Sequence, residues 1–482
     1  MSLLLGIDEG TSAVKAILFD TELRPVAEAR RAKPLAHPRP GWVEQEPEAI
    51  VTAVVEAVGE LLAGADEEIV ACGLDHQGES VLAWDAETGE ALTQVVTWQD
   101  KRSQQVLDRL EADDTAARVR ELSGMPLDPY FSAGKLTWLL ENDDAVGRAR
   151  EAGTLRLGTV DSFLCDRLGA GFATDPSTAS RTQLGAPEFD PALLEIFGVP
   201  AGALPAIADT AGDLGTLSHP SWPVELPLRA RCVDQQAALA GAGCVQPGMA
   251  KATYGTGVFV LAHAGDQRPE PTGGLLPTVA WRVDGRVEWA LDGGVFTAGA
   301  LLEWLSGDLG LAADPAALAA AAEQAGESGG VRLLPALAGV GAPWWRSDAR
   351  AVISGLTSGS GPGQIGYAAL EAIAWRVADV IAAMRETVPI EVLRVDGGLT
   401  RSEALLSLQA DTAGTIVQRG SIDATAAGAA ALAAVGAGAW GSTAEIADRV
   451  PVGEQVRPGR DREWREAAHE SWREFVRRAV EL

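Results

Sequence analysis

Residues 3–20 read Leu3-Leu-Leu-Gly-Ile-Asp-Glu-Gly-Thr-Ser-Ala-Val-Lys-Ala-Ile-Leu-Phe-Asp20, two apolar runs separated by a short polar turn. The first run ends at Asp8, and the second extends from Val14 to Phe19. This pattern predicts a β-hairpin whose turn is Glu9-Gly-Thr-Ser12. An ordinary edge hairpin carries a similar turn, so the segment alone leaves a structural and a phosphate-binding interpretation equally open.

The polar turn contains the groups that a phosphate-binding turn requires. A glycine at position 10 tolerates positive φ and lets backbone N–H groups approach a ligand. Thr11, Ser12 and Lys15 add hydroxyl and ammonium donors. A carboxylate such as Asp8 holds a divalent cation, often through water. We therefore predict that Gly10, Thr11, Ser12 and Lys15 contact phosphates and that Asp8 faces a metal ion.

A second unit of this kind lies near the middle of the chain, at Ala250-Lys-Ala-Thr-Tyr-Gly-Thr-Gly-Val-Phe-Val-Leu261. Its Gly-Thr-Gly turn again separates two strand-like runs. Two phosphate-type hairpins, one opening each half, suggest two related lobes that close on one nucleotide. We predict an N-terminal lobe over residues 1–241 and a C-terminal lobe over residues 242–482.

Bulk composition narrows the class of protein. The chain has 482 residues, too many for one simple core, and 39 basic against 67 acidic residues give a formal net charge of −28. Such an acidic surface argues against nucleic acid or an anionic membrane as the main partner. The four cysteines show no C-x-x-C spacing, and no apolar run reaches the length of a membrane span. We expect a cytoplasmic protein.

Strand-like and helix-like segments alternate along the chain, which predicts an α/β fold. Pro47 begins a helical stripe, and Glu68 to Leu74 reads as a buried strand followed by a polar loop. The last third repeats the pattern, with a helix from Gln364 to Met384 and a strand from Glu391 to Val395. The Asp396-Gly-Gly398 turn after that strand occupies the position where open α/β sheets bind ligands.

Two segments carry a resemblance to a known family: Tyr130-Phe-Ser-Ala-Gly-Lys-Leu-Thr-Trp-Leu-Leu-Glu-Asn142, and Ala351-Val-Ile-Ser-Gly-Leu356 followed after seven residues by Gln364-Ile-Gly-Tyr-Ala-Ala-Leu-Glu371. Both resemble the signature segments of the FGGY carbohydrate kinase family. The chain most resembles the branch of that family that acts on glycerol. Further parallels extend almost from end to end, at Pro40–Glu44, Trp98-Gln99, Asp128–Ser132, Thr178-Ala-Ser-Arg-Thr182, Asp234–Ala238, Gly248–Lys251, Tyr254–Gly257 and Arg394–Gly398.

The resemblance implies two actin-like (ribonuclease-H-type) lobes with a nucleotide and substrate cleft between them. It implies transfer of a phosphoryl group from ATP, with Mg²⁺, to a terminal hydroxyl of glycerol or a closely related small polyol. Positions matching the family's acceptor site are Gln77, Gly78, Glu79, Trp98, Tyr130, Asp234, Gln235 and Phe259. Positions matching its nucleotide contacts are Thr256, Gly299, Glu303, Gly398 and Ser402, together with Thr11, Lys15 and the metal-facing Asp8.

Asp234 is the candidate general base. It follows the apolar-leaning stretch Leu228 to Val233 and precedes a helix-like segment, and an acid beside a helix N-terminus is well placed to remain ionised. Phosphoryl transfer to an alcohol needs in-line positioning and a group that accepts the hydroxyl proton. From the residues alone, Asp234 is either this base or only a helix cap. By resemblance it takes the proton, and Gln235 binds a neighbouring hydroxyl. His76 receives no role.

The substrate loop departs from the family pattern. The glycerol-acting branch has Gln-Arg-Glu here, with the Arg contacting the substrate, whereas this chain has Gln77-Gly78-Glu79. Loss of the guanidinium removes a multidentate donor and leaves open volume, at a cost of about 1–3 kcal/mol per hydrogen bond. Either another residue fills the gap, or the acceptor is a longer polyol or a ketose, of the erythritol, xylitol or xylulose type.

Other expectations concern control and assembly. Some members of the family bind fructose bisphosphate through a basic loop, but the corresponding residues 218–226 contain no basic cluster. We therefore expect no such inhibition. A homodimer or homotetramer is the expected assembly, which the sequence does not decide. A non-catalytic actin-like nucleotide sensor is the remaining alternative, and the presence of Asp234, Glu79 and Trp98 argues against it.

Overall fold

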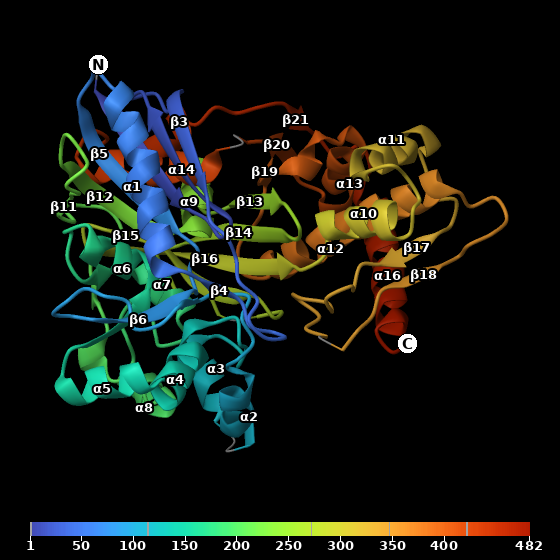
Figure 1. Ribbon diagram of the computed structural model, residues 1–482. Helices are drawn as coiled ribbons and strands as arrows, with labels where there is room; N and C mark the ends of the chain where they lie inside the picture. The colour runs from blue at the N-terminus through green and yellow to red at the C-terminus, as the bar shows by residue number, and fades with distance from the viewer. Residues whose placement is uncertain (1, 113–114, 271, 347, 421–422) are drawn as a thin grey trace.

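The opening segment forms the predicted hairpin in the computed structural model, which describes residues 2–112, 115–270, 272–346, 348–420 and 423–482. Strands β1 (Leu3–Glu9) and β2 (Ala13–Phe19) pair antiparallel, with Asp8 opposite Lys15. The side chains of the apolar runs are buried, as expected for a central strand pair. The hairpin lies in the interior of the N-terminal half (Figure 1).

The N-terminal sheet has the strand order β11-β12-β5-β1-β2-β3. Strands β1, β5 and β12 run parallel, so their carboxyl ends meet at one edge. Strand β5 extends to His76, so that His76 lies in the strand and not in the predicted loop. The further bounds are β3 Pro25–Ala32, β5 Ile69–His76, β11 Thr216–Leu217, β12 Leu226–Val233 and helix α1 Pro47–Gly64.

The C-terminal sheet, of order β15-β16-β14-β13-β19-β20-β21, repeats this plan. Strands β13 and β14 form the second predicted hairpin, and β13 runs parallel to β19, which runs parallel to β20. The series β3-β2-β1-β5-β12 therefore corresponds to β16-β14-β13-β19-β20. The bounds are β13 Met249–Tyr254, β14 Val258–Gly265, β15 Leu276–Val283, β16 Arg286–Val295, β19 Val392–Asp396, β20 Ile416–Arg419 and β21 Gln455–Val456.

Two short helices join the halves: α9 (Asp234–Gly241), which follows β12, and α14 (Ala424–Gly436), which follows β20. Their backbones approach so closely that a Cβ at Gly428 would lie 1.7 Å from the Ala237 carbonyl oxygen. Helix α14 also packs on β1, β5 and β12, although it belongs by sequence to the second half (Figure 1). The division at residue 241 accordingly remains a proposal.

A smaller layer lies below the N-terminal sheet in the view of Figure 1, and residues 77–80 connect β5 to this layer. Its sheet has the order β4-β7-β6-β8. The bounds of this layer are β4 Glu44–Gln45, β6 Val81–Asp85, β7 Val95–Val96, β8 Leu155–Thr159, α2 Gln104–Ala112, α3 Ala116–Ser123, α4 Ser132–Asn142, α5 Asp144–Ala152, α6 Val160–Arg167, α7 Pro176–Arg181 and α8 Pro191–Phe197.

Several helices of the C-terminal half pack around its sheet, and one of them is the helix that the sequence predicts from Gln364 to Met384. The helix expected from Gln364 begins two residues earlier, because Pro362 suits the first turn. The bounds are α10 Gly299–Glu303, α11 Pro315–Ala325, α12 Pro362–Met384, α13 Glu403–Ala413, α15 Ala444–Arg449 and α16 Arg462–Ala479. Within the described residues, no helix is both long and apolar enough to cross a membrane.

Candidate active site

Three carboxylates meet where the parallel strands of the N-terminal sheet end. Asp8 on β1 lies beside Asp75 on β5, and Asp234 begins the helix after β12. Burial raises the pKa of Asp8, against the opposing effects of a hydrogen bond with Asp75 and of the Lys15 and Lys33 ammonium groups. Burial raises the pKa of Asp75 further, and the adjacent Asp8 and Asp234 carboxylates add to that shift. The Asp75 carboxyl is fully buried, and its hydrogen-bonding neighbour is the Asp8 carboxyl.

Asp234 lies half-buried at the first turn of α9. Burial, followed by the Glu79 and Asp8 carboxylates, raises its pKa to about 7, while Lys251 opposes the shift. The Lys251 ammonium donates to the side chains of Gln235 and Thr253 and forms no hydrogen bond with Asp234 itself. The helix N-cap is Val233, whose side chain makes no capping bond. A carboxylate with a pKa near neutrality suits proton transfer at physiological pH.

The predicted phosphate turn is held by side chains from both halves of the molecule. The Lys15 ammonium pairs with Asp423, at the start of α14, and lies 3.5 Å from Glu28. The indole N–H of Trp98 donates to Thr11 Oγ1 over 2.9 Å, and the Gln45 amide donates to the Thr11 carbonyl. The turn is thus tied directly to the predicted acceptor site.

One expectation for this turn is wrong. Gly10 does not adopt positive φ. Its lack of a side chain instead leaves room beside Asp8, because a Cβ at Gly10 would lie 3.3 Å from Asp8 Oδ1. Ser12 is exposed and contributes its backbone carbonyl to Lys33 N–H.

The predicted acceptor residues Glu79, Trp98 and Tyr130 come together. The Trp98 and Tyr130 rings pack edge to face with centroids 5.7 Å apart. The Glu79 carboxylate is buried and accepts a 2.7 Å hydrogen bond from Nε of Arg181. Burial raises the pKa of the Tyr130 hydroxyl well above its usual range, and the nearby Glu79 carboxylate adds to that shift. Tyr130 therefore stays a neutral hydrogen-bond donor and acceptor.

Gly78 and Gln77 differ from the expectation. The Gly78 backbone has φ +55°, and a Cβ there would lie 3.0 Å from Val233 Cγ1, so the space at Cβ is not open. The Gln77 amide is buried; its nitrogen donates to Glu9 and Gln45, and its oxygen accepts from the Ser80 hydroxyl. Gln77 thus shapes the loop through its bonds to the protein. A buried Glu9–Lys33 ion pair lies beneath it.

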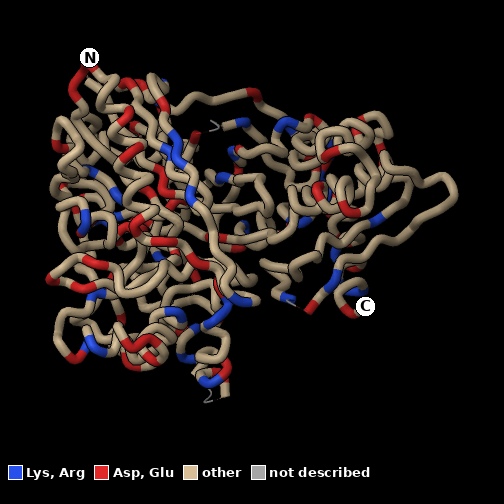
Figure 2. Tube along the Cα trace, viewed as in Figure 1, with Lys and Arg blue, Asp and Glu red and all other residues tan. Residues whose placement is uncertain are grey.

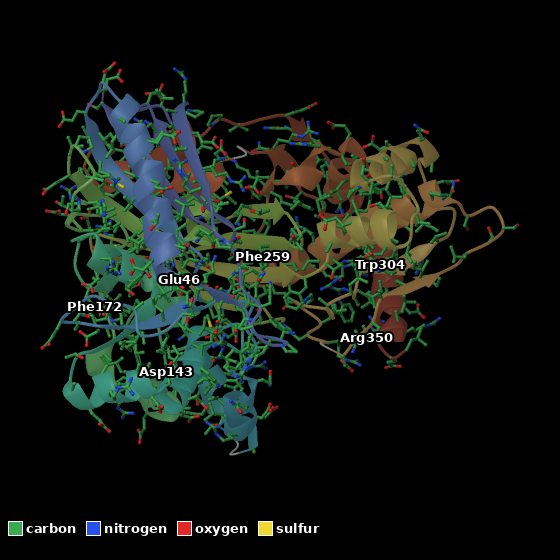
Figure 3. The ribbon with its side chains drawn as sticks, in the orientation of Figure 1. Glu46, Asp143, Phe172, Phe259, Trp304 and Arg350 are labelled. Atoms are coloured by element: carbon green, nitrogen blue, oxygen red, sulfur yellow. The ribbon has the colours of Figure 1, made fainter. Side chains whose placement is uncertain are left out.

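Phe259, labelled in Figure 3, lies on β14 where the C-terminal sheet meets the N-terminal half. Its register partner is Gly294 on β16, and the absence of a side chain at Gly294 makes room for the Phe259 ring. Asp292, two residues before Gly294, points to the same face of the sheet because side chains alternate along a strand. Phe259 and Asp292 therefore lie on one side of β14 and β16.

The predicted nucleotide residues gather around the second hairpin. The carbonyls of Gly255 and Thr256 accept the first N–H groups of α10, among them that of Gly299. A Cβ at Gly397 would lie 2.3 Å from the Tyr254 carbonyl, so the turn ending in Gly398 also packs against this hairpin. Ser402 caps α13 and donates to Glu323. Glu303 is exposed at the end of α10.

Several residues of the site were quoted in the sequence motifs or passed over without receiving a role. Arg181 and Lys251 lie inside motifs that carry the family resemblance. Asp75 and Asp292 are acidic residues within apolar strands, and this contrast is the sequence signal that could have identified them. His76, to which no role was given, is a buried core histidine that bonds to Thr178 Oγ1 over 2.8 Å.

Basic and acidic residues are interspersed over the molecule. Figure 2 shows basic residues scattered among acidic ones in both halves. The described part of the chain has no group of three or more His, Cys, Asp or Glu side chains arranged to hold a metal ion by themselves. Mg²⁺ at kinase sites is held by one or two carboxylates together with phosphates, and the adjacent Asp8 and Asp75 side chains fit that donor set.

Comparisons with known proteins agree with this geometry. Models of the N-terminal and C-terminal domains of the FGGY family of carbohydrate kinases match residues 3–241 and 250–437. A glycerol kinase from Citrifermentans bemidjiense is 40% identical over 99% of this chain and 98% of its own length. A glycerol kinase from Alkalilimnicola ehrlichii is 42% identical over 92% of each chain. The structure of Plasmodium falciparum glycerol kinase with ADP superposes with a TM-score of 0.94 at 28% identity, covering 100% of this chain and 98% of that one.

Proposed function

Because the chain belongs to the FGGY family of carbohydrate kinases, we propose that it transfers the γ-phosphoryl group of ATP to a terminal hydroxyl of glycerol or a closely related small polyol. The observation that carries this proposal is the position of Asp234, at the junction of the halves, with a pKa of about 7. The glycerol kinase relatives and the ADP-containing structure support the choice of acceptor and of nucleotide.

Asp234 is the general base of this mechanism. It accepts the proton of the attacking hydroxyl as the oxygen approaches the γ-phosphorus, a role typically worth about 10²–10⁴-fold in rate. Lys251 holds Gln235 next to it, so that the Gln235 amide is oriented toward a neighbouring hydroxyl. The raised pKa keeps the carboxylate basic enough to take the proton while it remains largely ionised above neutral pH.

The acceptor lies between Trp98, Phe259 and Tyr130, with Glu79 accepting from its hydroxyls. Aromatic faces cover the carbon backbone of a short polyol, and polar tips fix its orientation. The hydrogen bond from the Trp98 indole to Thr11 links this wall to the phosphate turn. Binding of the acceptor and placement of the phosphates are therefore coupled in one rigid unit.

The nucleotide phosphates lie between the two hairpins, near Gly10, Thr11, Ser12 and Lys15 on one side and Thr256 on the other. The base and ribose lie near Gly299, Glu303, Gly398 and Ser402. Asp8, with Asp75 beside it, would hold Mg²⁺, which neutralises charge on the transferred phosphoryl group. Four free buried cysteines support function in a reducing compartment such as the cytoplasm.

The test of this proposal is ADP release measured with glycerol, dihydroxyacetone, erythritol, xylitol, D-xylulose and L-ribulose as acceptors. We expect glycerol to give the highest kcat/KM. A longer polyol or ketose that is turned over well while glycerol is turned over poorly would contradict the choice of acceptor. Nucleotide binding without ADP release for any acceptor would contradict the assignment as a kinase.

A further inference from the structure

A buried arginine, Arg181, lies beside the loop formed by Gln77, Gly78 and Glu79. Arg181 ends helix α7, and only 4% of its surface is exposed. Its Nε donates to Glu79 Oε1 over 2.7 Å, and its Nη1 donates to Asp292 Oδ2 over 2.9 Å. The guanidinium therefore connects the substrate loop with strand β16 of the C-terminal sheet.

Part of the hydrogen-bonding capacity of this group is unused. The Nη2 nitrogen of Arg181 has no hydrogen-bond partner within the described residues. The second oxygen of Asp292, Oδ1, is buried and also lacks a partner in the described part of the chain. A guanidinium N–H needs an acceptor, and a buried carboxylate oxygen needs a donor. An alcohol hydroxyl accepts one hydrogen bond and donates another, so one hydroxyl satisfies both.

The position of Arg181 agrees with contact to the acceptor. The guanidinium carbon lies 5.6 Å from the centre of the Tyr130 ring, which itself packs against Trp98. Arg181 bonds to both Glu79 and Asp292, so these three charged groups lie together beside the Tyr130 ring. Asp292 shares the face of β14 and β16 that carries Phe259.

We propose that Arg181 and Asp292 together bind a hydroxyl of the acceptor that does not react, and that they set the preference for an acceptor with a hydroxyl at that position. This inference rests on the proposed kinase function and names the residues that select its substrate. It also accounts for Gly78, because the guanidinium reaches the acceptor from α7. If Arg181 only linked Glu79 to Asp292 structurally, its replacement would instead change the stability of the protein alone.

The variants Arg181→Lys and Asp292→Asn test this inference. Lysine keeps the charge but cannot bond both carboxylates as the planar fork does, and asparagine keeps the size but removes the charge. Loss of a charge-assisted hydrogen bond made equally in ground and transition states raises KM and leaves kcat nearly unchanged. We expect KM for glycerol to rise about 10- to 100-fold, with KM for ATP within about twofold of the parent value.

A second readout removes the hydroxyl from the acceptor. The parent enzyme should prefer glycerol strongly over propane-1,2-diol or propane-1,3-diol, each of which lacks one hydroxyl, and both variants should lose the preference against the same diol. Arg376→Lys is the matched control, because Arg376 is a buried arginine bonded to Asp379 over 2.9 Å and to the Gly341 and Ala342 carbonyls, none of which is a predicted acceptor residue. It should lower the melting temperature without changing KM for glycerol.

The outcomes separate the two proposals. If the parent phosphorylates glycerol and both variants keep its discrimination against the diols, Arg181 and Asp292 are structural and the inference is overturned. If the parent phosphorylates none of the acceptors, the proposed function itself is wrong and the inference falls with it. Lower stability with unchanged KM in Arg181→Lys, as in the Arg376 control, also overturns the inference.

Discussion

Helices α9 and α14 follow equivalent strands of the two sheets, and an acid stands at the start of each. Asp234 begins α9 after β12, and Asp423 directly precedes α14 after β20. Asp423 pairs with the Lys15 ammonium from the opposite half. Asp234 has no ion pair with any described residue, and the Lys251 ammonium, which opposes its pKa shift, donates to Gln235 and Thr253. The repeated fold thus places an acid at the start of each helix. Among the described residues, only the acid of α14 forms an ion pair.

The difference shows how a repeated fold acquires one reactive carboxylate. Desolvation without a bonded cation raises the pKa of an acid, whereas an ion pair favours its charged form. Burial raises the pKa of Asp234 to about 7, and the neighbouring Glu79 and Asp8 carboxylates act in the same direction. Asp423, at the start of α14, forms an ion pair that links the two halves. Asp234, at the start of α9, remains available to accept a proton.

The largest expected effect is that of Asp234→Asn. An amide cannot take the proton of the attacking hydroxyl, so kcat should fall on the order of 10²–10⁴-fold. ATP binding, measured by calorimetry, should stay within about threefold of the parent, because the phosphates contact other residues. Retention of more than a tenth of the parent kcat would show that Asp234 is not the base.

The next largest effect concerns the contact between the two helices. Gly428→Ala places a methyl group 1.7 Å from the Ala237 carbonyl oxygen, a clash with backbone that no rotamer change relieves. We expect a loss of about 3 kcal/mol or more in the free energy of unfolding, measured in urea. Gly147→Ala in α5, where a Cβ meets nothing within 4 Å, is the control and should be neutral or stabilising by up to about 1 kcal/mol. Equal stabilities for the two variants would contradict the close packing of α9 on α14.

The sequence predicts those parts of the fold that depend on local pattern. Both hairpins show as apolar runs around a Gly-Thr turn, and the strand, helix and turn near Asp396 follow from apolar runs bounded by glycine and proline. The position of Asp234 at a strand end also follows from local pattern. These features can be predicted because they depend only on residues that are close together in the sequence.

Contacts between distant segments could not be predicted in this way. Arg181 meets Glu79 across 102 residues and Asp292 across 111, and only the folded arrangement of α7 and β16 brings them together. The surroundings of Gly78 could not be predicted for a related reason. Its lack of a side chain suggested open volume, whereas Val233 from another strand lies 3.0 Å from the place of its Cβ. Packing of one element on another decides such positions.

A smaller effect follows from the pH dependence of the reaction. Asp234 must be deprotonated to act as base, so kcat/KM should fall about tenfold for each pH unit below about 7 and level off above it. Lys33 and Lys135 also have pKa values lowered to about 7 by burial. The residual activity of Asp234→Asn is therefore the control: it should lose the acid limb. If the activity of that variant still fell below a pH of about 7, the pH dependence would belong to a group other than Asp234.

The smallest effect is expected at the paired acid. Asp423→Asn breaks the ion pair with Lys15, whose side chains are 23% and 25% exposed, and pairs accessible to solvent contribute at most about 1 kcal/mol. The Asp423 side chain makes no capping bond to α14, so the helix should keep its start. We expect KM for ATP to change by no more than about fivefold, with kcat within about threefold, and the change to shrink as salt rises. A loss comparable to that of Asp234→Asn would mean that both acids take part in the chemistry, and the functional asymmetry between the two helices would disappear.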